Sequence, residues 1–294
     1  MTSGARAAKR SFHANYRGAA MTSPPDSYAL CEAALREGDR DRWLASMFAP
    51  ADRRPHLHAL YAFNLEVARV ASQVTQPLLG EMRLQFWTDL LNGEPQGEAR
   101  SNPVADALLT TLDACGLQRE PLLELLEARL FDLYGEPHPD VEAFDHYCDL
   151  TAGTLFRLAG QILAGAEASG VAAEPAGRAY ALTGLLRALP WLAAENKSLI
   201  PADLAATYGL GLVTRENTPG LRAALADLRA HARADLDRTV AALEQTPQPE
   251  ASAYRVMALP KLYLAQMDEA ADPLSPLPEI AQWRRQWALL RGKV

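Results

Sequence analysis

The segment that most constrains this chain runs from residue 59 to 72 and predicts a helix that is apolar almost all round. Its large apolar residues recur at three- and four-residue spacing, which is typical of a buried helix. One row of small or neutral side chains, Asn64, Ala68 and Ser72, is spaced by four residues and therefore stacks on one face. Such a row can line a cavity, but it offers no anionic oxygens to a divalent metal ion.

The remaining chain also favours helices, because Ala and Leu dominate and β-branched residues are sparse. No linker rich in Gly, Ser or Pro interrupts the middle, so we expect one all-α domain over residues 24–294. Pro190 is expected to kink or end its helix. Further helices are expected at residues 27–36, 42–48, 78–91, 103–112, 121–134, 141–164, 175–192, 221–244, 252–270 and 278–291, with a short one ending at Tyr208. The 252–270 helix is expected to be interrupted at Pro260.

Charge and cysteine usage exclude several classes of protein. The net charge of −7 is spread along the chain, whereas a nucleic-acid binder needs a clustered basic face. No apolar run reaches the roughly 20 residues that span a bilayer. Cys31, Cys115 and Cys148 lie far apart and have no metal-ligand spacing, which predicts buried free thiols in a reducing compartment.

Residues 1–23 are expected to form a leader or an alternative-start extension outside the fold. The first twenty residues contain four basic side chains, among them Arg6 and Arg17, but no acid. This composition resembles a mitochondrial transit peptide, although Met21 is an equally good start site. We expect a location in the bacterial cytoplasm, with membrane association left open and the mitochondrial matrix side as the alternative.

Four segments, in this order along the chain, resemble the squalene/phytoene synthase superfamily. Tyr61-Ala62-Phe63 resembles the start of its first signature helix, and residues 147–155 resemble its Tyr-Cys…Ala-Gly-Thr element. Residues 181–192 resemble its second aspartate motif, and residues 197–201 line up with its Arg-x-Tyr-Leu-Pro motif. The resemblance implies a single-domain, all-α fold of the isoprenoid-synthase type around a central cavity.

The resemblance also places two aspartate motifs, and both lack their carboxylates. Active members use these motifs to hold Mg²⁺ against a diphosphate leaving group. The matching residues here are Ala68 and Ser72 in the first motif and Ala188 and Leu192 in the second. We therefore predict no synthase activity, no catalytic residue, no metal site and no cofactor. The vestigial positions expected to line the cavity are Asn64, Ala68, Ser72, Gly184, Ala188 and Leu192.

Four other residues are candidate contacts for a ligand or an anion: Arg53, Tyr61, Arg187 and Lys197. In the superfamily, the segment before the first signature helix lines the diphosphate end of the pocket, and Arg53 falls there. An exposed first helical turn explains Arg53 equally well. Arg187 matches a residue of the second motif, and Lys197 begins the segment that lines up with Arg-x-Tyr-Leu-Pro.

A narrower resemblance is to the complex I assembly factor 6 family and its bacterial relatives, in which the synthase fold has lost its aspartates. It rests on residues 63–66, Phe-Asn-Leu-Glu, and residues 82–87, Met-Arg-Leu-Gln-Phe-Trp. Leu-Arg-Ala-Leu-Pro at residues 186–190 also fits. The resemblance implies a pseudoenzyme that assists biogenesis of respiratory complex I through protein contacts, with an isoprenoid or lipid as a further binding partner.

Two alternatives remain open beside this hypothesis. One is a head-to-head prenyl diphosphate synthase of the squalene/phytoene type with a degenerate site, and the other is a carrier for a quinone or isoprenoid tail. The C-terminal segment 278–291 is amphipathic. Its Ile280, Trp283 and Trp287 are predicted to pack onto the domain, with peripheral contact to a membrane or a partner as the alternative.

Overall fold

The computed structural model describes residues 26–93, 101–211, 213 and 215–292. The expected extension at residues 1–23 lies outside this range. All regular structure in the described residues is helical, which confirms the predicted all-α class. The elements are α1 (Ser27–Gly38), α2 (Arg40–Ser46), α3 (Arg54–Gln73), α4 (Pro77–Asn92), α5 (Pro103–Cys115), α6 (Glu120–Leu130), η2 (Phe131–Leu133), α7 (Val141–Cys148), η3 (Asp149–Gly153), α8 (Thr154–Ala164), η4 (Gly165–Glu167), α9 (Ala173–Ala194), α10 (Ala202–Thr207), α11 (Pro219–Leu243), η5 (Glu250–Ala258), α12 (Pro260–Glu269) and α13 (Gln282–Arg291).

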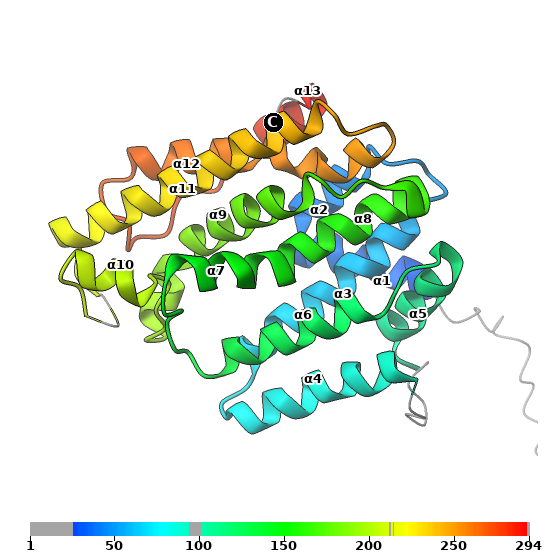
Figure 1. Cartoon of the computed structure of the whole chain (residues 1–294), viewed down its shortest axis with the longest axis horizontal. Coiled ribbons are helices and arrows are strands. Elements are labelled where there is room, and N and C mark those ends of the chain that lie inside the picture. The colour runs from blue at the N-terminus through cyan, green and yellow to red at the C-terminus, as the bar shows by residue number, and fades with distance from the viewer. Residues whose placement is uncertain (1–25, 94–100, 212, 214, 293–294) are drawn as a thin grey trace, which may run out of the picture.

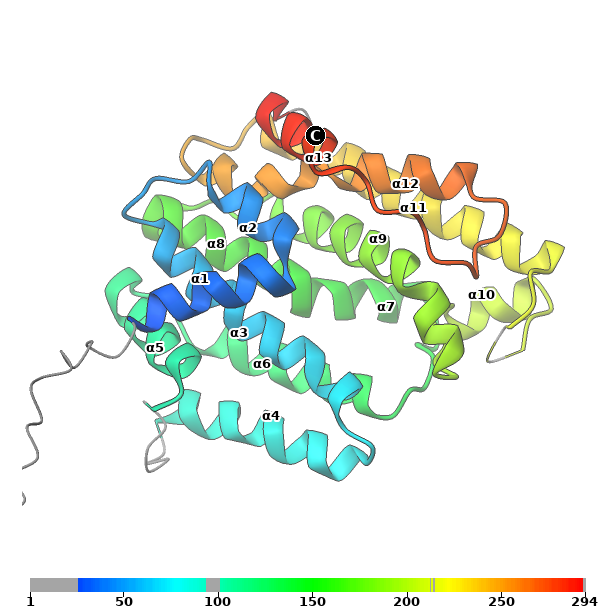
Figure 2. The ribbon, with the colours of Figure 1, turned by 180° about the vertical axis from the view of Figure 1, so that it is seen from behind.

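The long helices lie in stacked rows. Helix α4 forms one edge of the molecule, and α11, α12 and α13 form the opposite edge (Figures 1 and 2). Between these edges, α3 packs against α1 and α5, and α9 packs against both α11 and η3. The two helices that carry the sequence motifs, α3 and α9, therefore run through the middle of the stack.

Local sequence signals set several helix ends. The Asn102 side chain accepts hydrogen bonds from the backbone N–H groups of Val104 and Ala105, at 2.9 and 3.2 Å, and so caps α5. Gly116, at φ 63°, closes the same helix in the left-handed conformation. Thr218 caps α11 in the same way, accepting from the N–H of Leu221.

Helix α3 is the buried helix that its sequence predicts. Leu60, Phe63 and Val67 are at most 2% exposed, and Phe63 packs edge-on against Trp87 of α4 with ring centroids 5.0 Å apart. The C-terminal half of the helix differs, because Ala68 and Ser72 are exposed to solvent. Helix α3 thus passes from the core into the wall of an open cleft.

The small residues near residue 150 allow a close helix crossing. The predicted 141–164 helix is one continuous helical run, but its middle segment, η3, has π-helical hydrogen bonding. Helix α9 crosses this segment, and a Cβ atom on Gly177 would lie only 2.4 Å from the backbone nitrogen of Gly153. Only glycine at residue 177 permits that approach.

The two prolines expected to disturb helices have different outcomes. Pro190 does not end its helix, since α9 continues to Ala194. It lacks a backbone N–H and so removes one hydrogen bond from an otherwise continuous helix. The 252–270 segment is interrupted at Pro260, as its sequence predicts: the residues before it form the 3₁₀ segment η5, and α12 begins at Pro260 because proline is favoured in a first helical turn.

The C-terminal segment contains a clear correction. Ile280 is buried, as expected, but Trp283 and Trp287 are 68% and 52% exposed, so the prediction that they pack onto the domain is wrong. Helix α13 instead buries Arg285 and Leu289. The reason is ionic: Arg285 pairs with Asp41 at 3.1 Å and with Glu279 at 2.8 Å, which turns its face inward.

The buried apolar residues form two clusters. The larger one joins α1 to α6 with α8 and η5, and the smaller one joins α7, α10, α11 and the C-terminal half of α9. Cys31 and Cys148 are buried free thiols, as predicted, whereas the free thiol Cys115 is only half-buried. Burial raises the pKa of Cys31 to about 12. Among the described residues, we find no helix with the length and hydropathy to cross a membrane.

Candidate functional site

An open cleft lies where α3, α6, α7 and α9 meet, with a cavity volume of about 320 Å³. This volume is at the lower end of the roughly 300–1,000 Å³ common for small-molecule sites. Its wall is mainly apolar, and most of its polar side chains lie on α6, on η2 and the segment that joins it to α7, on α7 and on the segment after α9. The lining residues are Ala68, Ala71, Ser72, Arg129, Phe131, Asp132, Gly135, Glu136, His138, Phe144, Tyr147, Leu185, Ala188, Trp191, Leu192, Glu195, Lys197, Ser198 and Leu199.

Four of the six vestigial positions lie in this cleft. Ala68 and Ser72 come from α3, and Ala188 and Leu192 come from α9, so both vestigial motifs face one space. Three of these four side chains are apolar, and the fourth is a hydroxyl whose Oγ donates a hydrogen bond of 2.9 Å to the carbonyl of Arg69. The positions that would hold Mg²⁺ in a synthase therefore do not fit the ion, because they supply no carboxylate oxygen.

The other two positions lie outside the cleft lining. Asn64 is buried one turn before Ala68, and its Oδ1 atom has no hydrogen-bond partner among the described residues. Gly184 lines a neighbouring cavity of about 300 Å³, together with Arg187 and Tyr263. The row on α3 is thus only partly open to the cleft.

The four candidate ligand contacts do not come together. Lys197 lines the cleft and pairs with Glu195 at 3.1 Å. Arg187 faces the neighbouring cavity, with its guanidinium 3.7 Å from the ring centre of Tyr263. The other two lie elsewhere.

Tyr61 is buried beneath a cation. The Arg42 guanidinium lies 5.4 Å from its ring centre, and burial raises the pKa of Tyr61 to about 12. Arg53 is half exposed and lies 3.5 Å from the carboxylate of Asp52. Neither side chain lines the cleft.

Three acidic residues do line the cleft, but none takes the place of an aspartate motif. Asp132 is paired with Arg129 at 2.9 Å, Glu195 is paired with Lys197, and Glu136 is exposed. Within the described part of the chain, these carboxylates do not gather with other acidic, His or Cys ligands into a group of metal-binding size. The cleft therefore lacks the converging carboxylates that a diphosphate-bound cation needs.

The cleft wall contains a polar network that we did not predict from the sequence. Arg129 donates hydrogen bonds to Asp132 at 2.9 Å and to the Tyr147 hydroxyl at 2.6 Å. The Tyr147 O–H in turn donates to Asp132 at 2.8 Å. Burial raises the pKa of Tyr147 well above its ordinary value. The only sequence signal for this network was the opposite charge of Arg129 and Asp132, which lie three residues apart.

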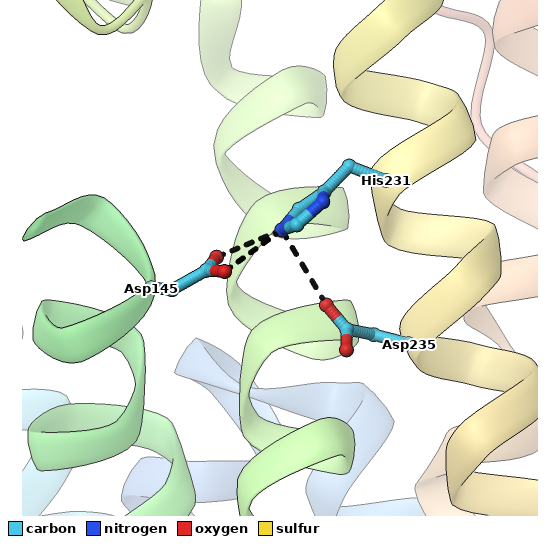
Figure 3. A group of neighbouring side chains, drawn as sticks. All are labelled: Asp145, His231 and Asp235. Carbon is cyan, nitrogen blue, oxygen red and sulfur yellow. Dashed lines mark hydrogen bonds and ion pairs between the residues drawn. The ribbon is translucent and has the colours of Figure 1, made fainter. Parts of the chain in front are cut away.

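A second polar group joins α7 to α11 (Figure 3). The Nε2 atom of His231 lies 2.9 and 3.0 Å from the two oxygens of Asp145, and 3.6 Å from Oδ2 of the buried Asp235. Among the described residues it is the one His and acid group with the spacing of metal ligands. However, Arg238 pairs with Asp235, and Arg178 lies 4.0 Å from Asp145.

Two adjacent guanidinium groups disfavour a cation at that position. The group fits an ionic link between helices better than a metal centre. Hydrogen bonding to Asp145 raises the pKa of His231, which favours the imidazolium that such a link requires. Burial raises the pKa of Asp235, which disfavours the charged form of that carboxyl.

Comparison with known proteins places this geometry in context. The squalene/phytoene synthase family model matches residues 35–291. Complex I assembly factor 6 of Homo sapiens is 26% identical over 227 residues, covering 75% of this chain and 68% of the relative. The homologue of Dictyostelium discoideum is 22% identical over 256 residues, covering 84% and 72% of the two chains.

Solved structures show the same fold. A dehydrosqualene synthase in complex with ligand superposes with a TM-score of 0.75 at 16% identity, covering 90% of this chain and 95% of that one. Squalene synthase HpnC from Alicyclobacillus acidocaldarius gives a TM-score of 0.68 at 20% identity, covering 83% and 93%. At these identities the likeness concerns the arrangement of the helices.

Proposed function

Because this chain belongs to the squalene/phytoene synthase family, we propose that it is a non-catalytic member that assists the biogenesis of respiratory complex I through protein contacts. One observation supports the proposed loss of catalysis. The two motif helices α3 and α9 still face a common cleft, but they present Ala68, Ser72, Ala188 and Leu192 to it. The helix arrangement of a synthase is present without the ligands for its metal ions.

The chemical argument concerns the leaving group. Ionisation of an allylic diphosphate leaves several negative charges on the departing group, which Mg²⁺ must neutralise. The cationic side chains that line the cleft are paired within the protein. Arg129 donates hydrogen bonds to Asp132 and Tyr147, and Lys197 is paired with Glu195. They offer little free positive charge to a diphosphate.

The assembly role draws support from the relatives. The similar proteins of human and mouse are both described as complex I assembly factor 6, at 26% identity over about three quarters of this chain. We infer the same kind of role here and expect the contacts to be made with proteins rather than with a substrate.

The direct test is turnover. Purified protein is incubated with Mg²⁺ and farnesyl or geranylgeranyl diphosphate, beside a heat-killed sample and an active dehydrosqualene synthase. We expect no diphosphate release above the heat-killed sample. Measurable release would instead establish the alternative, a prenyl synthase with a degenerate site.

A deletion strain tests the assembly role separately. Assembled complex I and isoprenoid products are measured in parallel, with the wild-type gene restored as the control. We expect less assembled complex and unchanged isoprenoids. Loss of an isoprenoid with normal complex I would contradict the proposal.

The apolar cleft also supports a second candidate, a carrier that holds an isoprenoid or quinone tail without converting it. Its lining residues Leu185, Ala188 and Leu192 form an apolar wall on α9. If the cleft binds such a tail, farnesol should raise the Tm, and Ala188→Phe should abolish that rise by filling the space. An unchanged Tm with every prenyl alcohol tested would remove this candidate.

A further inference from the structure

Helix α13 presents three large apolar side chains to solvent. Trp283, Trp287 and Leu290 are 68%, 52% and 60% exposed, while Arg285 and Leu289 are buried. The three exposed residues are spaced by four and three positions, so they form one stripe along the outer face of the helix. We call this stripe the α13 face. Large aromatic side chains left in water mark an interaction surface.

Positive charge borders this face. Helix α13 contains no acidic residue, and its exposed Arg284 and Arg291 lie on one flank of the stripe. The Arg291 guanidinium lies 5.0 Å from the ring centre of Trp287. The nearest acid in sequence, Glu279, is paired with the buried Arg285.

Neighbouring elements extend the same chemistry. At one end of α13, Arg40 of α2 donates a hydrogen bond of 2.7 Å to the Gln282 side chain. At the other end, Arg255 donates to the carbonyl of Leu289 and covers the ring of the partly exposed Phe48. The surface is therefore apolar with a cationic border, on a chain whose net charge is −7.

This combination fits one occupant. Helix α13 lies at the outer edge of the molecule, opposite α4 (Figures 1 and 2), and the stripe lines none of the cavities described above. A projecting helix with Trp and Leu on one face and Arg beside them is typical of helices that lie in a membrane interface. Tryptophan favours the headgroup level, and arginine can reach lipid phosphates from there.

We propose that the α13 face attaches this protein to the surface of a bilayer that contains anionic phospholipid. Trp283, Trp287 and Leu290 enter the interface, and Arg284 and Arg291 meet the phosphates. The attachment is peripheral. It is independent of the assembly role proposed above, because it depends on lipid alone.

The test is co-sedimentation of the full chain with vesicles of phosphatidylcholine, with or without about 30 mol% phosphatidylglycerol. The anionic headgroups of phosphatidylglycerol attract basic segments. We expect binding to the anionic vesicles, at least tenfold weaker binding to neutral vesicles, and weakening by 0.5 M salt. Trp fluorescence should shift to shorter wavelength on binding. Absence of binding to anionic vesicles overturns the proposal.

Two variants assign the binding to the α13 face. Trp283→Ala with Trp287→Ala should weaken binding at least tenfold, and Arg284→Glu with Arg291→Glu should remove the preference for anionic lipid. The matched control is Leu78→Ala with Met82→Ala on α4, which are 63% and 64% exposed and also four residues apart. Circular dichroism checks that each variant is folded.

The control pair should bind vesicles like the wild type. Equal loss in the control and in the tryptophan pair, or full binding by the tryptophan pair, would overturn the proposal. The proposal would also be overturned if the wild type did not bind vesicles and the Trp283→Ala, Trp287→Ala variant lost binding to a protein partner. The α13 face would then be a protein contact.

Discussion

His231 is held between two carboxylates that come from different helices. Asp145 of α7 lies on one side and Asp235 of α11 on the other, with Arg178 and Arg238 around them. A protonated imidazole completes this set, because it places a positive charge between two negative ones. The link should therefore depend on pH through the charge of His231.

The sign follows from the raised pKa of His231. A histidine whose pKa is higher in the folded state contributes stability in full below its unfolded pKa of about 6.5. That contribution is lost as pH rises through the folded value. We expect the urea midpoint of the wild type to fall as pH rises above about 6.5, and His231→Gln to flatten that part of the profile.

Comparison with the His231→Gln variant separates the contribution of His231 from that of the other histidines. Burial lowers the pKa of His56 and His138, so their contribution has the opposite sign and remains in the variant. The difference between the wild-type and His231→Gln profiles therefore isolates the link. If the two profiles run parallel over this range, the ionic link contributes nothing to stability.

Helix α9 shows how one element combines a packing position with an open one. Gly177 meets the backbone of Gly153 at the crossing with η3, whereas a Cβ on Gly184 would have no heavy atom within 4 Å. Both glycines lie in the same helix, and glycine weakens a helix interior relative to alanine. Their substitutions should therefore have opposite effects.

We expect Gly177→Ala to destabilise the protein by about 1–3 kcal/mol or more, because the added methyl forces two backbones apart. Gly184→Ala should be neutral or stabilise by up to about 1 kcal/mol. Urea unfolding of both variants measures the difference. Equal effects at the two positions would show that the crossing at η3 adjusts freely.

The whole molecule keeps the architecture of a synthase around a cleft without its metal ligands. Ala68 and Ser72 on α3, and Ala188 and Leu192 on α9, line that cleft. If the helices still have the geometry of an active relative, returning carboxylates to these four positions should recreate cation binding. This expectation concerns the spacing of two helices rather than any single side chain.

We expect the Tm to rise with MgCl₂ in the combined variant Ala68→Asp, Ser72→Asp, Ala188→Asp and Leu192→Asp. At a Mg²⁺ concentration of 100 times Kd, the gain in the free energy of unfolding would be about 2.7 kcal/mol. The matched control carries Asn at the same four positions and should show no rise. If the wild-type protein is stabilised by Mg²⁺ to the same extent, other groups hold the ion and our account of the cleft is wrong.

Sequence reasoning predicted the helical class, the buried face of α3 and the family, because these depend on local periodicity and on motifs written in order along the chain. It also placed four vestigial positions that the fold brings into one cleft. The loss of carboxylates from the two motifs is visible in the sequence, but only the structure shows that the other acids of the described cleft do not gather in their place.

Tertiary structure alone decided the rest. The direction of α13 depends on Arg285, whose partner Asp41 lies 244 residues away in sequence, so periodicity favoured burial of the wrong face. The Arg129, Asp132 and Tyr147 network likewise exists only where α6, η2 and α7 meet. Periodicity reports which face of a helix is apolar, but long-range ion pairs and packing determine which face is turned to the core.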